Sequence, residues 1–142
     1  MMGIETGITR AGLQNLTVDI SGIEVSDDPG RVLVTYSLGS CLGLAAYDPV
    51  AGVGGMVHCM LPMSKIDQAK AELKPGMFVD TGVPKLLQLL FQMGATRRNL
   101  VLKAAGCAKL LDEKNMFRIG ERNNAVLRKL LWKNNLLLAS EQ

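Results

Sequence analysis

The stretch CLGLAAYDPVAGVGGMVHCML, residues 41–61, contains two apolar runs joined by a short connection. The runs CLGLAAY at 41–47 and VGGMVHCML at 53–61 each have the length of a strand. The connection DPVAG holds a Pro and a Gly where a hairpin turn needs them. Pro62 ends the second run. The sequence therefore predicts a β-hairpin here.

Two further strands are predicted before the hairpin. Apolar residues alternate with polar ones at Leu16, Val18, Ile20, Ile23 and Val25. This alternation indicates a strand with a bulge or break at Gly22. SDDPG at 26–30 is a turn signal, and RVLVTYSL at 31–38 is rich in β-branched residues, as a second strand would be. Residues 1–15 have no clear period, and we expect them to be peripheral or poorly ordered.

A helix is predicted after the hairpin, over about 80–93. Its apolar positions fall at helical spacing, at Val83, Leu86, Leu87, Leu90 and Phe91. We expect Asp80 to be the N-cap, Pro84 to lie in the first turn, and Gly94 to stop the helix. The polar segment 63–76 before it is predicted to be a surface loop.

The rest of the chain predicts a strand at 99–105, a helix at about 121–134 and a final strand in LLLAS at 136–140. Strands come first and then alternate with helices. This order predicts an α+β fold, a layered sandwich of a mixed or antiparallel β-sheet with two main helices. No repeat or linker is visible, so we expect one domain over residues 1–142.

Composition excludes several classes of function. Of 142 residues, 48% are hydrophobic and 20% charged, which is typical of a folded globular protein. The net charge of +3 is scattered and aromatic residues are only 4%, so nucleic-acid binding is not expected. Because the N-terminus lacks a signal-peptide core and no apolar run reaches about 18 residues, we expect a cytoplasmic protein with no membrane insertion.

Metal and cofactor chemistry are not indicated. His58 is the one histidine, and the three cysteines, Cys41, Cys59 and Cys107, lack CxxC spacing, so we expect neither a metal site nor a cofactor. A reducing compartment would keep the three cysteines as thiols, and no disulfide framework is expected. Any Cys–His chemistry must use His58.

Cys41 and His58 can be placed side by side by the hairpin. If the turn is 48–51, Tyr47 pairs with Gly52 and Cys41 faces His58 at a Cβ separation of about 4.5–5.5 Å. A loop longer by one residue would set Cys41 opposite Cys59 instead.

In the first register the imidazole would stabilise the Cys41 thiolate, which makes the two residues a possible nucleophile and base. Gly39 and Ser40, just before the cysteine, could bring backbone donors to an oxyanion. A structural role fits the same spacing, because free cysteines are often buried and a lone histidine in an apolar strand is often a core residue. We interpret Cys59 as a core residue.

Residues 34–62, VTYSLGSCLGLAAYDPVAGVGGMVHCMLP, closely resemble the signature of the CheD family of chemoreceptor glutamine deamidases. The resemblance includes the GSC turn, the DPV connection, the seventeen-residue step from Cys41 to His58, and a Thr six residues before Cys41. GMFVDTGVPKLL at 76–87 and IGERN at 119–123 resemble further motifs of the family. The similarity covers roughly residues 16–139.

The resemblance implies that Cys41 is the nucleophile, His58 the base, and Thr35 the residue that holds or orients the histidine. Its substrate would be glutamine side chains of methyl-accepting chemoreceptors, with hydrolysis of a carboxamide C–N bond. The same thioester route would also serve glutamyl methyl esters. One departure from the family pattern is Cys107, which stands where the family usually has the second glycine of Gly-Gly-Ala.

Two other functions remain open. The resemblance also implies binding to CheC-type chemotaxis phosphatases, so the chain could be a regulator and not an enzyme. A Cys–His hydrolase of another substrate class is a third possibility, because nothing in the local sequence specifies glutamine.

Overall fold

The computed structural model describes residues 13–108 and 118–142. Its strands are β1 (Gln14–Thr17), β2 (Ile23–Ser26), β3 (Arg31–Val34), β4 (Leu42–Asp48), β5 (Val53–Cys59), β6 (Val101–Gly106) and β7 (Leu138–Glu141). Its helices are α1 (Gln68–Leu73), α2 (Val79–Gln92) and α3 (Ile119–Lys133), with short 3-10 turns at Ser64–Ile66, Pro75–Met77 and Arg97–Asn99.

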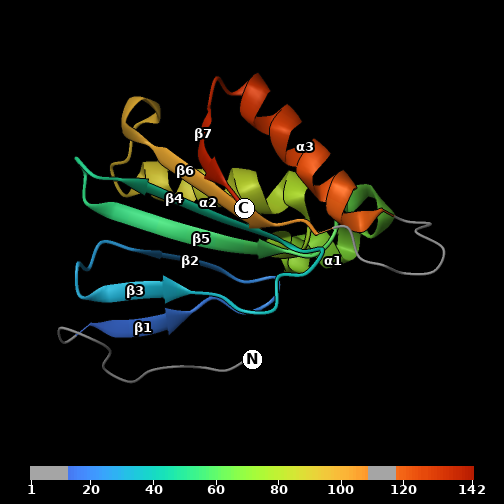
Figure 1. Cartoon of the computed structure of the whole chain (residues 1–142), viewed down its shortest axis with the longest axis horizontal. Coiled ribbons are helices and arrows are strands. Elements are labelled where there is room, and N and C mark those ends of the chain that lie inside the picture. The colour runs from blue at the N-terminus through green and yellow to red at the C-terminus, as the bar shows by residue number, and fades with distance from the viewer. Residues whose placement is uncertain (1–12, 109–117) are drawn as a thin grey trace.

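The described strands form two sheets. Five make a mixed sheet in the order β2-β5-β4-β6-β7, in which only the β6–β7 pair is parallel. β1 and β3 form a separate parallel pair, which lies beyond β2 in Figure 1. The hairpin predicted from the sequence is β4–β5, at the centre of the larger sheet.

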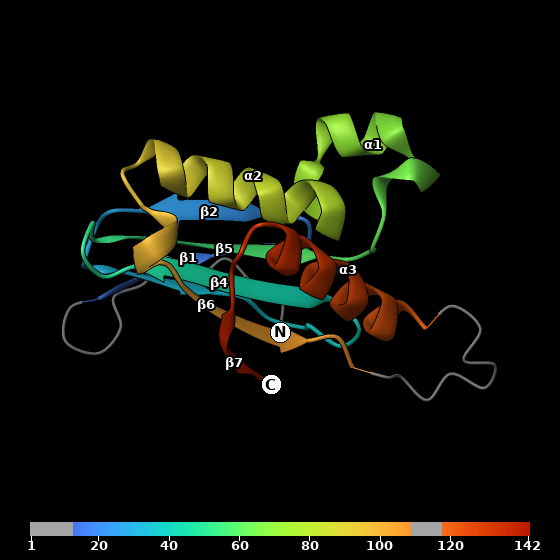
Figure 2. The ribbon, with the colours of Figure 1, turned by 90° about the horizontal axis from the view of Figure 1, so that it is seen from above.

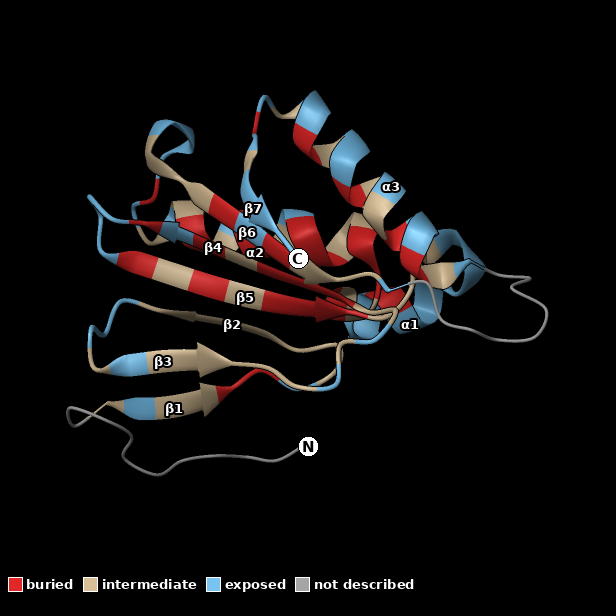
Figure 3. Ribbon diagram, in the orientation of Figure 1, coloured by how far each residue is buried: buried red, intermediate tan, exposed pale blue. Residues whose placement is uncertain are grey.

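Both long helices pack on one side of the five-stranded sheet (Figure 2). Strand alternation places Leu42, Leu44 and Val57 on this side, where they join the apolar stripe of α2 in the core. Figure 3 shows the resulting buried residues along β4 and β5. The predicted α+β layered sandwich with two main helices is confirmed.

The first predicted strand is instead two strands in different sheets. The chain turns at Ser21 and Gly22, where Ser21 has φ 66° and a Cβ on Gly22 would lie 2.8 Å from the Asp19 carbonyl oxygen. β1 and β2 therefore separate at this turn. Gln14 and Asn15, from the segment expected to be peripheral or poorly ordered, belong to β1, while residues 1–12 lie outside the described residues.

The predicted surface loop 63–76 was wrong in part, because it contains α1. Asp67 caps this helix by accepting a hydrogen bond from the Lys70 N–H. α2 follows with nearly the predicted bounds and ends before Gly94, which has φ 102°.

Two details of the α2 prediction were also wrong. The N-cap is Phe78, and Asp80 lies inside the first turn, where its carboxylate accepts hydrogen bonds from the N–H and hydroxyl of Ser64. Pro84 is the sixth residue of the helix, so its ring replaces an N–H that would have bonded to Asp80. No helix among the described residues is long and apolar enough to cross a membrane.

A buried carboxylate sets the register of the hairpin. Asp48, 1% exposed, accepts hydrogen bonds from the N–H groups of Val50 and Ala51 at 2.8 and 2.9 Å. It also binds the N–H of Thr96 at 2.9 Å, which fastens the hairpin to the segment after α2. Asp48 consequently pairs with Val53, and the turn occupies residues 49–52. The predicted pairing of Tyr47 with Gly52 was wrong by two residues.

Asp48→Asn should lower stability at neutral pH. The N–H of Ala51, followed by those of Thr96 and Val50, lowers the pKa of Asp48 against the opposing effect of burial. The stabilisation is therefore present above the ordinary Asp value of 3.8 and is lost as pH falls through the folded-state pKa. Asparagine has no charge, and its amide cannot accept all three hydrogen bonds.

Thermal unfolding measured across pH tests this effect of Asp48 on stability. We expect the melting temperature of Asp48→Asn to be several degrees below wild type at pH 7, and the difference to shrink in acid. Asp27→Asn is the control, because it removes the same charge from an exposed turn residue. Equal melting temperatures for wild type and Asp48→Asn at pH 7 would contradict the role assigned to Asp48.

Candidate functional site

Thr35 fixes the tautomer of His58, the single histidine. The Thr35 hydroxyl donates to the Val18 carbonyl oxygen at 2.7 Å and lies 2.8 Å from Nδ1 of His58. A hydroxyl has one proton, and a carbonyl can only accept, so Thr35 must accept the Nδ1–H of His58. The neutral imidazole therefore has its lone pair on Nε2, a buried atom with no hydrogen-bond partner among the described residues.

Burial keeps the imidazole neutral. His58 is fully buried, and desolvation lowers its pKa below the ordinary 6.5. At neutral pH, Nε2 is then the unprotonated nitrogen of the ring. A base in this state can take a proton from a thiol or a water molecule.

Gly43 lies directly opposite His58 in the β4–β5 ladder. A Cβ on Gly43 would lie 2.9 Å from a methyl carbon of Leu38, so the missing side chain leaves the space that Leu38 fills. Thr35, Leu38, Gly43 and Met56 line part of a surface hollow of about 220 Å³. Alternation of β4 and β5 places this hollow on the side of the sheet away from α2 and α3.

Cys41 does not face His58, because of the register set at Asp48. The ladder ends with Leu42 opposite Cys59, and Cys41 lies just before β4. It makes no hydrogen bond with His58, whose Nδ1 is bound to Thr35 and whose Nε2 is free. The two predicted registers, with Cys41 opposite His58 or opposite Cys59, were both wrong.

The state of the Cys41 thiol also differs from the prediction. Cys41 is half-buried, and desolvation raises its pKa above the ordinary 9.0. The thiol is therefore protonated at neutral pH, and an adjacent imidazole does not stabilise its thiolate here. Cys59 is fully buried in the core, as predicted.

The turn before Cys41 offers backbone donors. Gly39 adopts φ 46°, a left-handed conformation that favours glycine. The N–H of Cys41 is occupied by the Leu38 carbonyl. Within residues 13–108 and 118–142, no hydrogen-bond acceptor is found for the N–H groups of Gly39 and Ser40.

Asn123 links the segment before Cys41 to the segment after His58. The sequence analysis did not single it out. Its side-chain amide donates to the Ser40 carbonyl at 2.9 Å and to the Met60 carbonyl at 3.1 Å. It is fully buried on α3, and it lies beyond the end of the β4–β5 ladder. The sequence signal was a polar residue on the stripe that continues with Leu127 and Leu131, at i+4 and i+8.

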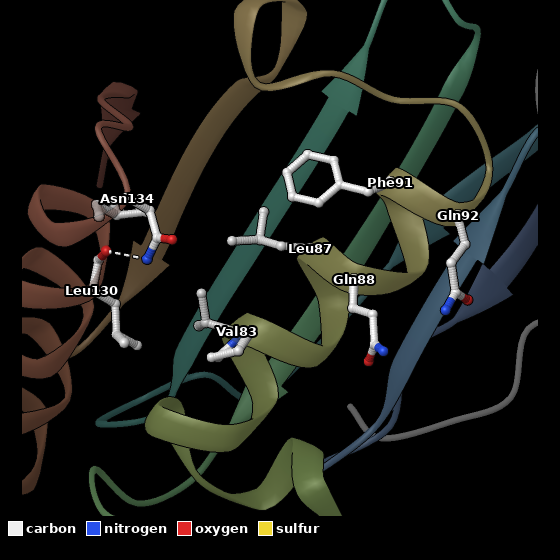
Figure 4. A pocket seen from close by; sticks show the side chains of 9 residues that line it. Val83, Leu87, Gln88, Phe91, Gln92, Leu130 and Asn134 are labelled. Atoms are coloured by element: carbon white, nitrogen blue, oxygen red, sulfur yellow. Dashed lines mark hydrogen bonds between the residues drawn. The ribbon is translucent and has the colours of Figure 1, made fainter.

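An apolar groove of about 440 Å³ lies between α2 and α3, away from His58 (Figure 4). Leu87 and Phe91 point into it from α2, and Leu130 lines it from α3. Asn134, whose amide donates to the Leu130 carbonyl, lies at its far side. Its lining includes no thiol, acid or base, so it cannot supply the chemistry available around His58.

Comparisons with known proteins agree on one family. The family model described as CheD chemotactic sensory transduction matches residues 60–142. The "probable chemoreceptor glutamine deamidase CheD 1" of Syntrophus aciditrophicus is 47% identical over 127 residues, covering 89% of this chain and 79% of the relative. The "probable chemoreceptor glutamine deamidase CheD" of Solibacter usitatus is 48% identical over 129 residues, covering 91% and 76%.

Thr35→Val should remove the preference of His58 for a single tautomer. Valine has a similar shape but cannot accept the Nδ1–H of His58, so the proton should distribute between the two ring nitrogens. Nitrogen NMR of the imidazole checks this without assignment, because the chain has one histidine. We expect one tautomer, with the proton on Nδ1, in wild type and in the control Thr35→Ser, and a mixture in Thr35→Val. A mixture already present in wild type would overturn the assignment.

Asn123→Ala should loosen the segment around Cys41. The change leaves the Ser40 and Met60 carbonyls without this donor, at a cost of roughly 1–3 kcal/mol in unfolding free energy. Urea unfolding measures that cost, and hydrogen exchange at the Cys41 amide should become faster. Asn124→Ala is the neighbouring control on the same helix. If the two variants exchange the Cys41 amide at the same rate, Asn123 does not hold this segment.

Proposed function

This chain belongs to the CheD family, and from that premise we propose that it hydrolyses glutamine side-chain amides of methyl-accepting chemoreceptors. Its relatives bear the name chemoreceptor glutamine deamidase. The observation that carries the proposal is the state of His58, which burial keeps neutral and Thr35 holds in the tautomer with its lone pair on Nε2, next to the strand end where Cys41 lies.

The proposed reaction begins with proton transfer from Cys41 to Nε2 of His58. The sulfur then attacks the carbonyl carbon of the glutamine carboxamide and forms a tetrahedral intermediate. The N–H groups of Gly39 and Ser40 are the proposed donors to its oxyanion. Thr35 accepts the Nδ1–H throughout, so the imidazolium that forms keeps a partner for its second proton.

In the second half of the reaction, the same imidazole acts first as an acid and then again as a base. Protonated His58 donates its Nε2 proton to the leaving nitrogen, and ammonia departs as the C–N bond breaks. A water molecule, deprotonated by the same Nε2, then attacks the thioester at its carbonyl carbon. The carbon–sulfur bond breaks, glutamate is released, and the Cys41 sulfur recovers its proton from His58.

Cys41 and His58 must approach each other during this reaction, since they are not hydrogen-bonded at rest. Catalytic contacts of this kind often tighten only when substrate is bound. The raised pKa of Cys41 is consistent with this order of events, because the thiol would lose its proton only when Nε2 comes within reach. Between turnovers the nucleophile stays protonated and less reactive.

Glutamyl methyl esters fit the same route as a second substrate. The thioester would form with loss of methanol in place of ammonia, and the hydrolysis step would be unchanged. Both reactions give a glutamate on the receptor, so a single site would serve both.

Cys41→Ala tests the function. The variant lacks the sulfur that forms the thioester, and we expect deamidation of a receptor cytoplasmic fragment to fall by roughly a thousandfold or more. Mass spectrometry of the fragment detects each glutamine converted to glutamate. The removed side chain is small, so binding to a CheC-type phosphatase should be nearly unchanged.

Two outcomes would count against the enzyme. Full deamidation by Cys41→Ala would exclude the thioester route. A wild-type protein that binds the phosphatase but deamidates no receptor fragment would instead favour the regulatory role.

A further inference from the structure

Cys107 lies across the sheet from Cys41. The β4–β6 ladder pairs Leu42 with Gly106, and one step further the N–H of Cys107 donates to the Cys41 carbonyl at 2.8 Å. Cys41 and Cys107 share this one bond, because the Cys41 N–H binds the Leu38 carbonyl, and both lie one residue past a ladder whose paired Cα atoms are about 4.5–5.5 Å apart. Disulfides need a Cα separation of roughly 4.4–6.8 Å. The two backbones are therefore at bridging distance.

The two thiols also share an environment. Both are half-buried, and both are free. Burial, then the charges of Glu141 and Cys41, raise the pKa of Cys107 to about 11. A Cys41 thiolate is thus close enough to disfavour a second negative charge on Cys107.

The backbone at Cys107 favours glycine, yet it carries a thiol. Cys107 has φ 57°, and Gly106 before it has φ 88°. Any side chain on Gly106 would collide with the Cys41 carbonyl oxygen, so the strands approach closely here. A left-handed conformation is uncommon for a residue with a Cβ and is strained. Cys107 therefore carries its thiol at a strained position beside Cys41.

We propose that Cys107 is a resolving thiol, which forms a reversible disulfide with Cys41 when a hydroperoxide oxidises the chain. The Cys41 thiol loses its proton to solvent and its sulfur attacks one oxygen of hydrogen peroxide; the O–O bond breaks and the leaving hydroxide takes up a proton to give water, so Cys41 becomes a sulfenic acid. The sulfur of Cys107 then loses its proton and attacks the Cys41 sulfur. The S–O bond breaks and water leaves. Two thiols have been oxidised, and one peroxide has been reduced to water.

The bridge would protect the nucleophile. A sulfenic acid with no thiol partner is oxidised further to sulfinic and sulfonic acids, which a dithiol does not reverse. With Cys107 opposite, the first oxidation is captured as a disulfide that a dithiol can reduce. Only the effect on deamidation rests on the proposed function, because the thiol pair is a feature of the strands themselves.

Cys59 is the competing partner, since it is opposite Leu42 on the other neighbouring strand. It is fully buried, and a Cβ on Gly82 would lie 3.0 Å from its sulfur, so α2 packs closely over it. Desolvation, followed by the charges of Cys41 and Cys107, raises its pKa far above the ordinary 9.0. Cys107 is the more accessible and more readily ionised of the two.

The test treats the whole chain with hydrogen peroxide and maps its cysteines by mass spectrometry without reduction. We expect a peptide linking Cys41 to Cys107, a loss of two hydrogens from the intact mass, and a fall from three free thiols to one. Dithiothreitol should restore all three thiols. A link to Cys59, or sulfinic acid at Cys41 with no link, would overturn the proposal.

Cys107→Gly is the matched variant, because glycine fits the backbone at this position. Under the same peroxide treatment, its Cys41 should be converted to sulfinic and sulfonic acids that dithiothreitol does not reverse. Cys107→Ser repeats the test with a side chain retained. If either variant keeps a fully recoverable Cys41, Cys107 is not the resolving thiol.

Measurements of deamidation distinguish a failure of this proposal from a failure of the proposed function. Oxidised wild type should lose nearly all deamidation and regain it with dithiothreitol, whereas oxidised Cys107→Gly should not recover. If unoxidised wild type has no deamidase activity, the linked peptide still decides whether the thiol pair bridges. If deamidation is present and the linked peptide is absent, only the thiol pair is wrong.

Discussion

The register of the β4–β5 hairpin is the constraint on which the site depends, and the Asp48 carboxylate sets it. Three backbone N–H groups converge on this buried side chain: those of Val50 and Ala51 fold the connection into a turn over residues 49–52, and that of Thr96 ties the turn to the segment after α2. Side chains in strands alternate between faces, so the turn decides which residue lies opposite His58. That residue is Gly43, and only a glycine there leaves room for Leu38. A carboxylate at one end of the hairpin thus determines the surroundings of an imidazole near the other.

The opposite end of the hairpin needs a different kind of support, because the ladder stops before Cys41. Asn123 supplies it from α3 by binding the carbonyls of Ser40 and Met60. Helix packing therefore positions the proposed nucleophile, while sheet pairing positions the proposed base. Cys41 and His58 are thus held by different parts of the fold, which gives a physical reason why they are not paired in the sheet.

Local sequence patterns predicted most of the elements and little of the geometry between them. Periodicity located α2 to within about one residue at each end, because its apolar stripe and Gly94 are local signals. The register could not be predicted, since one of the hydrogen bonds that fixes Asp48 comes from Thr96, far along the chain. The bond between Thr35 and His58 was expected from family resemblance alone. Asn123 was missed because its role requires knowing where α3 docks.

The loop from Thr35 to Cys41 carries the proposed nucleophile and the residue that orients the base, while the base itself, His58, comes from β5. Thr35 orients the base, Leu38 fills the space above Gly43, and the turn at Gly39 precedes the nucleophile, all within seven consecutive residues. Insertions and deletions are usually tolerated in surface loops, but here any change of length would alter the distance between base and nucleophile at once. Evolution can therefore adjust this enzyme to new receptors only from outside the loop. Its recognition surfaces should diversify while this segment keeps a fixed length.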